Sequence, residues 1–446
     1  MLGYRFTKIR RMKMAFIKSK AKLTTLVLAT LFANQSYADT KVIHAGELLV
    51  EAGKKTLSKH SVVITDGKII DVKKGFIKPG SISKDAVLVD LSDDFVLPGL
   101  MDMHVHLQGE LGPRNDSDAL RLSDADKLVK SAMYAERTLM AGFTTVRDLG
   151  GLPEQSFALR DGIAKGWIAG PRIVAAGSNV AVTGGHGDVD GMKPDLLHMH
   201  TAKTVCDGPF DCRRATRHAI KFGADVIKIT STGGVLSDTN TGTGQQMADD
   251  ELKEVVETAH ALGRKVASHA HAAAGINAAL RAGVDSIEHG SYANEESIRL
   301  FKETGAYLVP TLMAGDTVVG MAKTSNFMSD AIKAKAIRVG GDMIANFKRS
   351  YKSGVNIAYG TDSGVSKHGT NAKEAVLMFE AGMKPQDILK AATVNSAKLL
   401  GLDSKIGTIE IGKQADIIAV KSSPIKDISV LMDVNFVMKG GKVFKQ

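Results

Sequence analysis

Two hydrophobic patterns divide the chain. Between residues 41 and 96, short segments of alternating apolar and polar residues are separated by glycine, aspartate and lysine, which is typical of strands joined by turns. The same pattern returns near the end, over residues 407–420 and 435–444, and the second segment contains the turn-forming pair Gly440-Gly441. We therefore expect one small β domain that is built from both ends of the chain around a central insertion.

The central insertion has the pattern of repeated βα units. Short β-branched runs alternate with helical stretches such as residues 249–262, where apolar residues from Leu252 to Ala259 follow the i, i+3, i+4, i+7 spacing of a helix packed on a sheet. An open doubly wound sheet is the alternative, although no Gly-x-Gly-x-x-Gly motif follows the first strand. The leading architecture is a closed (β/α)8 barrel. Its strands are expected at residues 100–106, 144–148, 172–176, 226–230, 266–269, 286–289, 307–310 and 356–361.

The predicted fold class is thus α/β, a (β/α)8 TIM barrel with a small β-sandwich domain formed by both ends of the mature chain. The first and eighth strands end about 260 residues apart, close to the roughly 250 residues of a whole barrel. The expected division is a signal peptide over residues 1–38, the sandwich domain over 39–97 and 403–446, and the barrel over 98–402.

The first 38 residues have the composition of a secretory signal peptide. A basic segment precedes the apolar stretch 23–33, and the small residues Ser36 and Ala38 stand at −3 and −1 of a cleavage site before Asp39. An uncleaved membrane anchor is the alternative. No apolar run reaches the roughly 18 residues of a transmembrane helix. We therefore expect an exported protein, periplasmic or secreted, with no stable membrane span once the signal is removed.

The basic charge of the chain is concentrated in this leader. The formal net charge is +10, but eight basic residues and no acidic residue precede Asp39, which leaves only about +2 for the rest. The rest contains no basic run with interleaved aromatic residues, the pattern of a nucleic-acid groove. We therefore expect no nucleic-acid partner.

The chain has two cysteines, Cys206 and Cys212. Their separation of six residues allows a small disulfide loop in an oxidising compartment, and two free thiols are the alternative. No Cys-x-x-Cys or Cys/His finger spacing is present, so neither thiol is a candidate metal ligand.

Side chains that bind metals stand at the ends of five of the eight predicted strands. His104 and His106 end the first strand, where the alternation of a strand places both imidazoles on one face. In a (β/α)8 barrel the carboxyl ends of the strands form the active site, so these side chains should meet at one end of the barrel. Two neutral imidazoles can bind one divalent metal ion. The remaining candidates, which end the fourth, fifth, sixth and eighth strands, are Lys228, His269, His289 and Asp362.

Lys228 is unusual in this set because an ammonium group repels a metal ion. Its position at an apolar strand end indicates either a lysine that lines the core or a chemically altered lysine.

The ordered motifs resemble those of the amidohydrolase superfamily with a binuclear metal centre. The likeness spans essentially the whole mature chain. Further motifs, Gly184-Gly185-His186-Gly187 and Ser231-Thr232-Gly233-Gly234-Val235, are similar to those of prolidase-like and Xaa-Arg/Lys-dipeptidase-like enzymes, with imidazolonepropionase-like proteins as close neighbours. The motifs that carry the resemblance are Pro98-Gly99-Leu100-Met101-Asp102-Met103-His104-Val105-His106, Ile227-Lys228-Ile229, Ser268-His269-Ala270-His271, Ile287-Glu288-His289-Gly290 and Gly360-Thr361-Asp362.

The resemblance implies two divalent metal ions, with zinc as the expected metal. It implies that His104 and His106 hold the first ion, that His269 and His289 hold the second, and that a carbamylated Lys228 bridges both. A carbamate is an anionic ligand with two oxygens, which can span two cations as an ammonium cannot. Asp362 would be the catalytic residue, which ligates the first metal and moves protons while a hydroxide between the metals attacks the amide carbon.

Two further histidines are candidates for substrate binding. His186 lies in a glycine-rich loop after the third strand, and His271 lies two residues beyond a predicted ligand. Both could donate hydrogen bonds to a substrate carboxylate, and a supporting role behind the ligands is the alternative for His271. Arg147 and Asp148, at the end of the second strand, are predicted to form a structural ion pair, and contact with the substrate is the alternative.

The predicted function is metal-dependent hydrolysis of the amide bond of dipeptides or N-acyl amino acids, as in Xaa-Pro or Xaa-Arg/Lys dipeptidases. Hydrolysis of cyclic or aromatic amides, as in imidazolonepropionase-like or ochratoxin-amidase-like proteins, is the alternative within enzymes. An exported metal- or solute-binding protein is the non-enzymatic alternative. The partner is a small-molecule substrate, and the resemblance suggests a homo-oligomer. The sequence leaves the leaving amino acid and the metal identity open.

Overall fold

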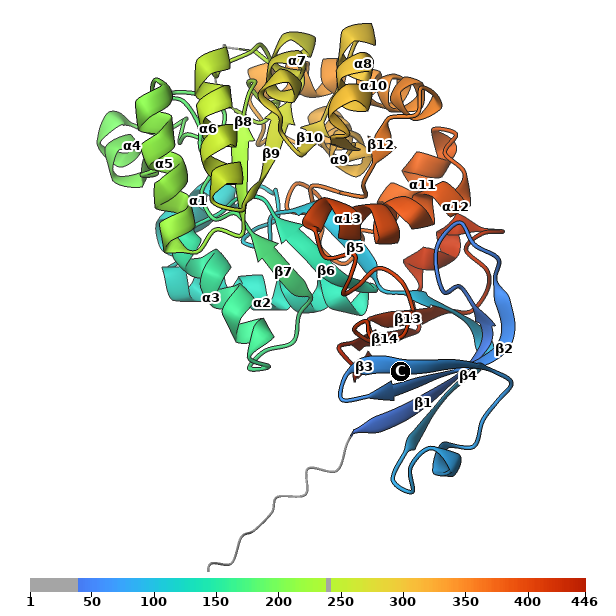
Figure 1. Ribbon diagram of the computed structural model, residues 1–446. Helices are drawn as coiled ribbons and strands as arrows, with labels where there is room; N and C mark the ends of the chain where they lie inside the picture. The colour runs from blue at the N-terminus through green and yellow to red at the C-terminus, as the bar shows by residue number, and fades with distance from the viewer. Residues whose placement is uncertain (1–38, 238–241) are drawn as a thin grey trace, which may run out of the picture. The chain divides into compact units, whose positions relative to one another are not determined.

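The structure, a computed structural model, describes residues 39–237 and 242–446 (Figure 1). The predicted signal peptide at residues 1–38 lies outside the described residues. Residues from Asp39 onward cluster as one compact unit, so the domain boundaries expected near residues 97 and 402 stay predictions. In the part of the chain that the structure describes, no helix combines the length and the apolar character needed to cross a membrane.

All eight predicted central strands are present, and they run parallel in two sheets. One sheet has the order β5-β6-β7 and the other the order β12-β11-β10-β9-β8. Their side chains are mostly buried, as expected for parallel strands that are covered on both faces. The strands are β5 (Leu100–Val105), β6 (Phe143–Asp148), β7 (Arg172–Ala175), β8 (Val226–Thr230), β9 (Lys265–Ala270), β10 (Ser286–His289), β11 (Tyr307–Val309) and β12 (Asn356–Ile357).

Single backbone hydrogen bonds join the two sheets at both seams. At one seam the N–H of Asp225 donates to Ala175 and that of Val180 to Lys228, both at 2.8 Å. At the other seam the N–H of Met103 donates to the carbonyl of Tyr359 at 2.7 Å. The expected fold class, a barrel with an added sheet domain, is confirmed. The eight barrel strands form a three-stranded and a five-stranded sheet instead of one continuous ladder.

The eighth strand is shorter than predicted. β12 ends at Ile357 instead of residue 361. The N–H of Ala358 still bonds to Leu308 of β11, but Tyr359 and Asp362 bond to β5 instead. The segment therefore changes partner across the seam, which interrupts the regular ladder.

Helices follow each central strand and lie outside the sheets (Figure 1). The predicted helix at residues 249–262 is observed as α6, and its residues from Leu252 to Ala259 with the predicted spacing are buried. The helices are α1 (Asn115–Arg121), α2 (Asp124–Met140), α3 (Pro153–Ala164), α4 (Pro194–His200), α5 (Pro209–Phe222), α6 (Asp249–Ala261), α7 (Ala273–Ala282), α8 (Glu295–Thr304), α9 (Leu312–Thr324), α10 (Asp330–Lys352), α11 (Lys373–Glu380), α12 (Pro385–Lys390) and α13 (Ser396–Leu400), with a π turn at Ala391–Asn395 and 3-10 turns at Pro79–Ser81 and Ile428–Met432.

Both ends of the described chain join one mixed sheet, as the alternating pattern predicts. The sheet has the order β15-β14-β13-β4-β1-β2-β3, so the C-terminal strands enter it where β13 pairs with β4 (Figure 1). It is one continuous ladder and not the two separate sheets of a sandwich. Its strands are β1 (Thr40–Leu48), β2 (Leu57–Thr65), β3 (Lys68–Lys74), β4 (Val87–Pro98), β13 (Ile417–Val420), β14 (Phe436–Lys439) and β15 (Lys442–Lys445).

The two faces of this sheet belong to different cores. Successive residues alternate between the faces, as in any strand. Val96 and Ile417 belong to a cluster formed mainly by the sheet's own strands, whereas Leu97 and Ile418 belong to the large cluster that includes the barrel. Asp416 adds a polar link, because its Oδ2 accepts a hydrogen bond from Arg172 of β7 at 2.6 Å. The sheet therefore supports the amino-terminal side of β5, which begins immediately after β4.

A glycine at the register shift between β1 and β4 tests this packing. A Cβ on Gly46 would lie 2.2 Å from the backbone oxygen of Ser92, so we expect Gly46→Ala to destabilise the protein by about 2 kcal/mol or more. Gly80→Ala is the matched control, because a Cβ there meets no atom within 4 Å, and it should stay within about 0.5 kcal/mol. Urea denaturation of both variants measures the difference in their free energies of unfolding. Equal values would show that the backbone near Gly46 can move to make room for the Cβ.

Candidate metal centre and substrate cavity

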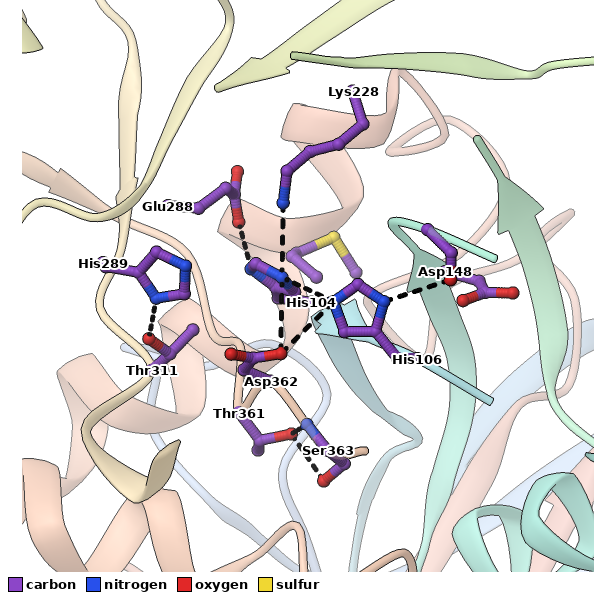
Figure 2. Close-up of polar contacts among 12 residues, drawn as sticks. His104, His106, Asp148, Lys228, Glu288, His289, Thr311, Thr361, Asp362 and Ser363 are labelled. Atoms are coloured by element: carbon purple, nitrogen blue, oxygen red, sulfur yellow. Dashed lines mark hydrogen bonds and ion pairs between the residues drawn. The ribbon is translucent and has the colours of Figure 1, made fainter. Parts of the chain in front are cut away.

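The structure brings four of the predicted ligand residues to one point (Figure 2). The Nε2 atoms of His104 and His106 lie 3.3 Å apart. Oδ1 of Asp362 lies 3.6 Å from the first nitrogen and 3.3 Å from the second, and Nζ of Lys228 lies 3.4 Å from His104 Nε2. His104 lies in β5 and His106 directly follows it, Lys228 lies in β8, and Asp362 lies in the segment after β12, so residues far apart in sequence form one group.

In His104 and His106, the hydrogen bond made by Nδ1 determines whether Nε2 carries a proton or a lone pair. His104 Nδ1–H donates to Glu288 Oε2 at 2.9 Å, and His106 Nδ1–H donates to the carbonyl of Gly150 at 3.1 Å. Because both partners are acceptors, the proton of each neutral ring sits on Nδ1 and the lone pair sits on Nε2. Two lone pairs therefore point toward the carboxylate of Asp362.

This donor set fits a divalent cation. The ligand atoms of His104, His106 and Asp362 lie within 4.8 Å of one another, and Asp362 Oδ1 is buried with no hydrogen-bond partner. Burial holds the pKa of His104 well below its usual value. Burial also lowers the pKa of His106, but the Asp362 carboxylate more than offsets this and the pKa is raised. Positive charge is thus favoured between His106 and Asp362.

His269 and His289 lie beside this group. Their ring centroids are 4.6 Å apart, and the His289 ring is 5.1 Å from that of His104. Burial keeps the pKa of both histidines well below the usual value, so both rings are neutral and suited to metal binding. His289 Nδ1 lies 2.7 Å from Thr311 Oγ1, which leaves its Nε2 for a ligand.

Unusual backbone conformations coincide with these strand ends. His289, Thr311 and Asp362 have positive φ values of 70°, 50° and 56°, although none is glycine. Such conformations cost about 1–3 kcal/mol each and persist where the surroundings fix them. At Asp362 the backbone N–H bonds to the carbonyl of His104 at 2.7 Å, which holds the two ligands together.

The buried carboxylate of Asp102 holds β5 and the segment of Asp362 together. Asp102 Oδ1 accepts from the backbone N–H groups of His104 and Thr361, and its Oδ2 accepts from Thr361 Oγ1 and Asn371 Nδ2. Burial raises the pKa of Asp102 to about 6, against the opposing effect of these hydrogen bonds. Asp102 therefore joins β5 to the segment that carries Asp362.

The predicted Arg147–Asp148 ion pair is wrong. Arg147 Nη2 lies 2.8 Å from Glu288 Oε1 in the barrel interior, with both side chains buried, while Asp148 accepts from Ser156 Oγ at 3.3 Å. Neighbouring residues of a strand point to opposite faces, so residues 147 and 148 could not both face the interior.

Sequence reasoning also missed the role of Glu288. Its carboxylate bonds to His104 on one oxygen and to Arg147 and Ser286 Oγ on the other. The same alternation could have found it, because Ser286 and Glu288 share the inward face of β10. Metal-binding histidines usually have such a carboxylate behind them, which fixes the ring and its tautomer.

The two predicted substrate-binding histidines line the same cavity, of about 350 Å³. His186 Nδ1 lies 2.7 Å from Ser237 Oγ, and His271 Nδ1 lies 2.7 Å from Ser291 Oγ. Burial lowers the pKa of His186 to about 3 and that of His271 to about 4, so both are neutral. If each serine donates to Nδ1, the remaining N–H of each ring is a hydrogen-bond donor in the cavity.

Of the two states left open for the cysteines, the structure contains the disulfide Cys206–Cys212. Both residues are buried, and the N–H of Cys206 bonds to the carbonyl of Ala181 at 2.9 Å. The disulfide thereby ties the end of the long segment after β7, which carries His186, to the start of α5.

Comparison with known proteins gives matches over nearly the whole chain. A model of the amidohydrolase family matches residues 95–444. Ochratoxinase from Aspergillus niger is 32% identical over 439 residues, which cover 93% of this chain and 88% of that protein. The structure of a Xaa-Pro dipeptidase with methionine bound in its active site is 42% identical, with a TM-score of 0.87, and covers 92% of this chain and 100% of its own. The structure of a prolidase complexed with N-methylphosphonate-L-proline is 28% identical, with a TM-score of 0.83, and covers 91% and 100%.

The role of Glu288 leads to a test. In Glu288→Gln the side-chain amide can rotate and donate to His104 Nδ1, which would move the imidazole proton to Nε2. We expect zinc affinity, measured by competition with a chromophoric chelator, to fall about 10- to 100-fold. The control is Glu303→Gln, which removes an exposed pair with Arg299 far from the site. Wild-type affinity in folded Glu288→Gln protein would rule out this positioning role.

Proposed function

Because the chain belongs to the amidohydrolase family, we propose that it hydrolyses the amide bond of dipeptides or N-acyl amino acids at a binuclear metal centre. The resemblance inferred from the motifs is confirmed, as is the prediction of an enzyme that acts on carbon–nitrogen bonds. One observation carries the proposal. The two Nε2 lone pairs, the unpartnered Asp362 oxygen and the Lys228 amine converge at a cavity of dipeptide size.

The relatives support an amino acid as the leaving group. The Xaa-Pro dipeptidase structure contains methionine in its active site, and the prolidase structure contains N-methylphosphonate-L-proline. Xaa-Pro dipeptides are therefore the first substrates to consider, and the sequence motifs add Xaa-Arg/Lys dipeptides. An aromatic amide is the second candidate, because the ochratoxinase relative matches along 93% of this chain.

We propose that the metal ions are zinc and that the predicted residues hold them. His104, His106 and Asp362 would hold one ion and His269 and His289 the other, with a carbamylated Lys228 between them. Bound zinc would polarise the substrate carbonyl and lower the pKa of bound water. For the carbamate, the Lys228 amine nitrogen adds to carbon dioxide and releases one proton. Burial lowers the pKa of Lys228 to about 8, which favours the neutral amine that this addition requires.

The other site residues bind substrate and move protons. His186 and His271 would donate from Nε2–H to the carboxylate of the leaving residue, which sets the scissile amide over the ligand group. The carboxylate of Asp362 would accept the proton of the attacking water on the oxygen that does not bind metal, and would then deliver it to the leaving nitrogen. A neutral amine departs because the nitrogen is protonated as the carbon–nitrogen bond breaks.

We further propose that the mature enzyme acts outside the cytosol, as the leader predicts. The buried Cys206–Cys212 disulfide supports this proposal, because such bonds persist mainly in oxidising compartments.

The proposed reaction is tested directly by amine release. The purified chain, supplied with zinc, is incubated with Xaa-Pro, Xaa-Arg/Lys, Xaa-aromatic and N-acyl amino acid substrates, and the released amino acid is measured with ninhydrin. We expect release from at least one class and its loss when a chelator removes the metal. Silence on all classes from metal-loaded protein would contradict the proposal and turn attention to cyclic amides.

The role of Asp362 is tested by Asp362→Asn. The amide keeps the size of the side chain but cannot carry the proton, so we expect kcat to fall by about 10²- to 10⁴-fold while metal is retained. Asp403→Asn, a change outside the cavity lining, serves as the control. Metal content is measured in the same samples, and full activity in Asp362→Asn would remove the assigned role.

A further inference from the structure

The cavity has one polar and one apolar side. The predicted metal and substrate histidines, Lys228 and Asp362 form the polar side. The apolar side comes largely from two helices that follow β11. Its residues are Ala314, Gly315 and Val318 of α9 and Val339, Gly340 and Met343 of α10. We name these six residues the apolar wall.

We propose that the apolar wall receives the side chain of the substrate's C-terminal, leaving residue, and that the enzyme therefore releases apolar amino acids in preference to lysine or arginine. The proposal rests on the proposed function, because it assigns the specificity of the same site.

Two glycines bring the helices of the wall together. A Cβ on Gly340 would lie 2.3 Å from Val319 Cγ2 and 3.3 Å from the carbonyl oxygen of Gly315, and a Cβ on Gly315 would lie 2.9 Å from Met343 Sδ. The helices therefore pack closely where both line the cavity. A larger residue at either position would push the helices apart or displace Val319 or Met343.

The wall adjoins the residues proposed to bind the substrate carboxylate. Val235 and Leu236, which follow β8, also line the cavity, and the next residue, Ser237, contacts His186. Lys335 of α10 donates to the carbonyl of Ser237 at 2.6 Å and that of Gly234 at 3.3 Å. This places α10 on the segment that fixes His186. A carboxylate and a side chain on the same Cα are close together, so the side chain facing the wall belongs to the C-terminal residue.

A substrate lysine or arginine side chain that reached the apolar wall would carry a buried charge. Such a charge is costly unless a carboxylate pairs with it. Among the described lining residues, the carboxylates are Glu110 and Asp362.

Neither carboxylate is suited to that role. Asp362 belongs to the ligand group. Glu110 already accepts from the N–H of His368 at 2.9 Å and lies 4.0 Å from Arg137. Glu110 also follows β5, whereas His271 follows β9, which belongs to the other sheet.

The first test measures the wild-type chain, supplied with zinc, on dipeptides with a constant first residue. We expect kcat/KM for Ala-Leu, Ala-Met, Ala-Phe or Ala-Pro to exceed that for Ala-Lys, Ala-Arg and Ala-Glu by about 100-fold. Equal or faster release of lysine or arginine would overturn the apolar preference and leave the proposed function standing. No hydrolysis of any member would contradict the proposed function and this inference with it.

The second test compares neighbouring residues of α10. Met343 lines the cavity, whereas Ile344 is 46% exposed and does not. We expect Met343→Asp to lower kcat/KM for the best apolar substrate at least about tenfold and to raise the Ala-Lys to Ala-Leu ratio, while Ile344→Asp changes neither by more than about twofold. Identical ratios in both variants would overturn the proposal.

A binding measurement covers the case in which Met343→Asp does not fold. Free L-leucine and L-methionine, as product probes, should raise the Tm of the zinc-loaded wild-type chain, and L-lysine at the same concentration should not. An equal or larger shift with L-lysine would overturn the proposal.

Discussion

The structure depends on the enforced proximity of electron-rich atoms at the end of β5. Two imidazole lone pairs lie 3.3 Å apart, and a buried carboxylate oxygen stands at 3.3 and 3.6 Å from them. Such groups repel one another or remain unsatisfied unless a cation lies among them. Hydrophobic burial alone would not select this arrangement. It requires fixed partners behind each ring, which are Glu288 and the Gly150 carbonyl, and a backbone at Asp362 that is held in a left-handed conformation.

The need for a fixed partner behind the His104 ring also explains why the interior of the barrel contains polar side chains. Arg147 of β6 donates to the carbonyl of Met103 in β5 and to Ser286 and Glu288 in β10. β5 and β6 belong to one sheet and β10 to the other, so this network connects the two sheets through the interior. Removing one partner of a buried ion pair costs about 3–5 kcal/mol, because the other charge is left without compensation. The ion pair that orients His104 therefore also supports the closure of the barrel.

The sequence predicted those features that follow from local periodicity. The eight strands and the inward histidines of β5 follow from an alternation that is visible without any partner. The partner of Arg147 was misassigned because pairing was inferred from adjacency, although alternation already placed Asp148 on the other face. The early end of β12 and the disulfide depend on tertiary contacts, such as the bonds from β5 to residues 359–363, that no local pattern contains. The apolar wall was missed for a similar reason. The role of the glycines of α9 and α10 is visible only in the packing of the two helices against each other.

The division of the cavity separates chemistry from specificity. Most residues of the polar side lie at buried strand ends. Hydrogen bonds from Asp102 and Glu288 link these residues, so a substitution of one of them disturbs the others. The apolar wall stands on two helices outside the strand network and touches the polar side mainly through Lys335 and the segment after β8. A substitution in the wall can therefore alter which leaving residue fits while the ligand geometry is kept. Loop and helix variation over a fixed set of strand ends is how barrels acquire different substrates.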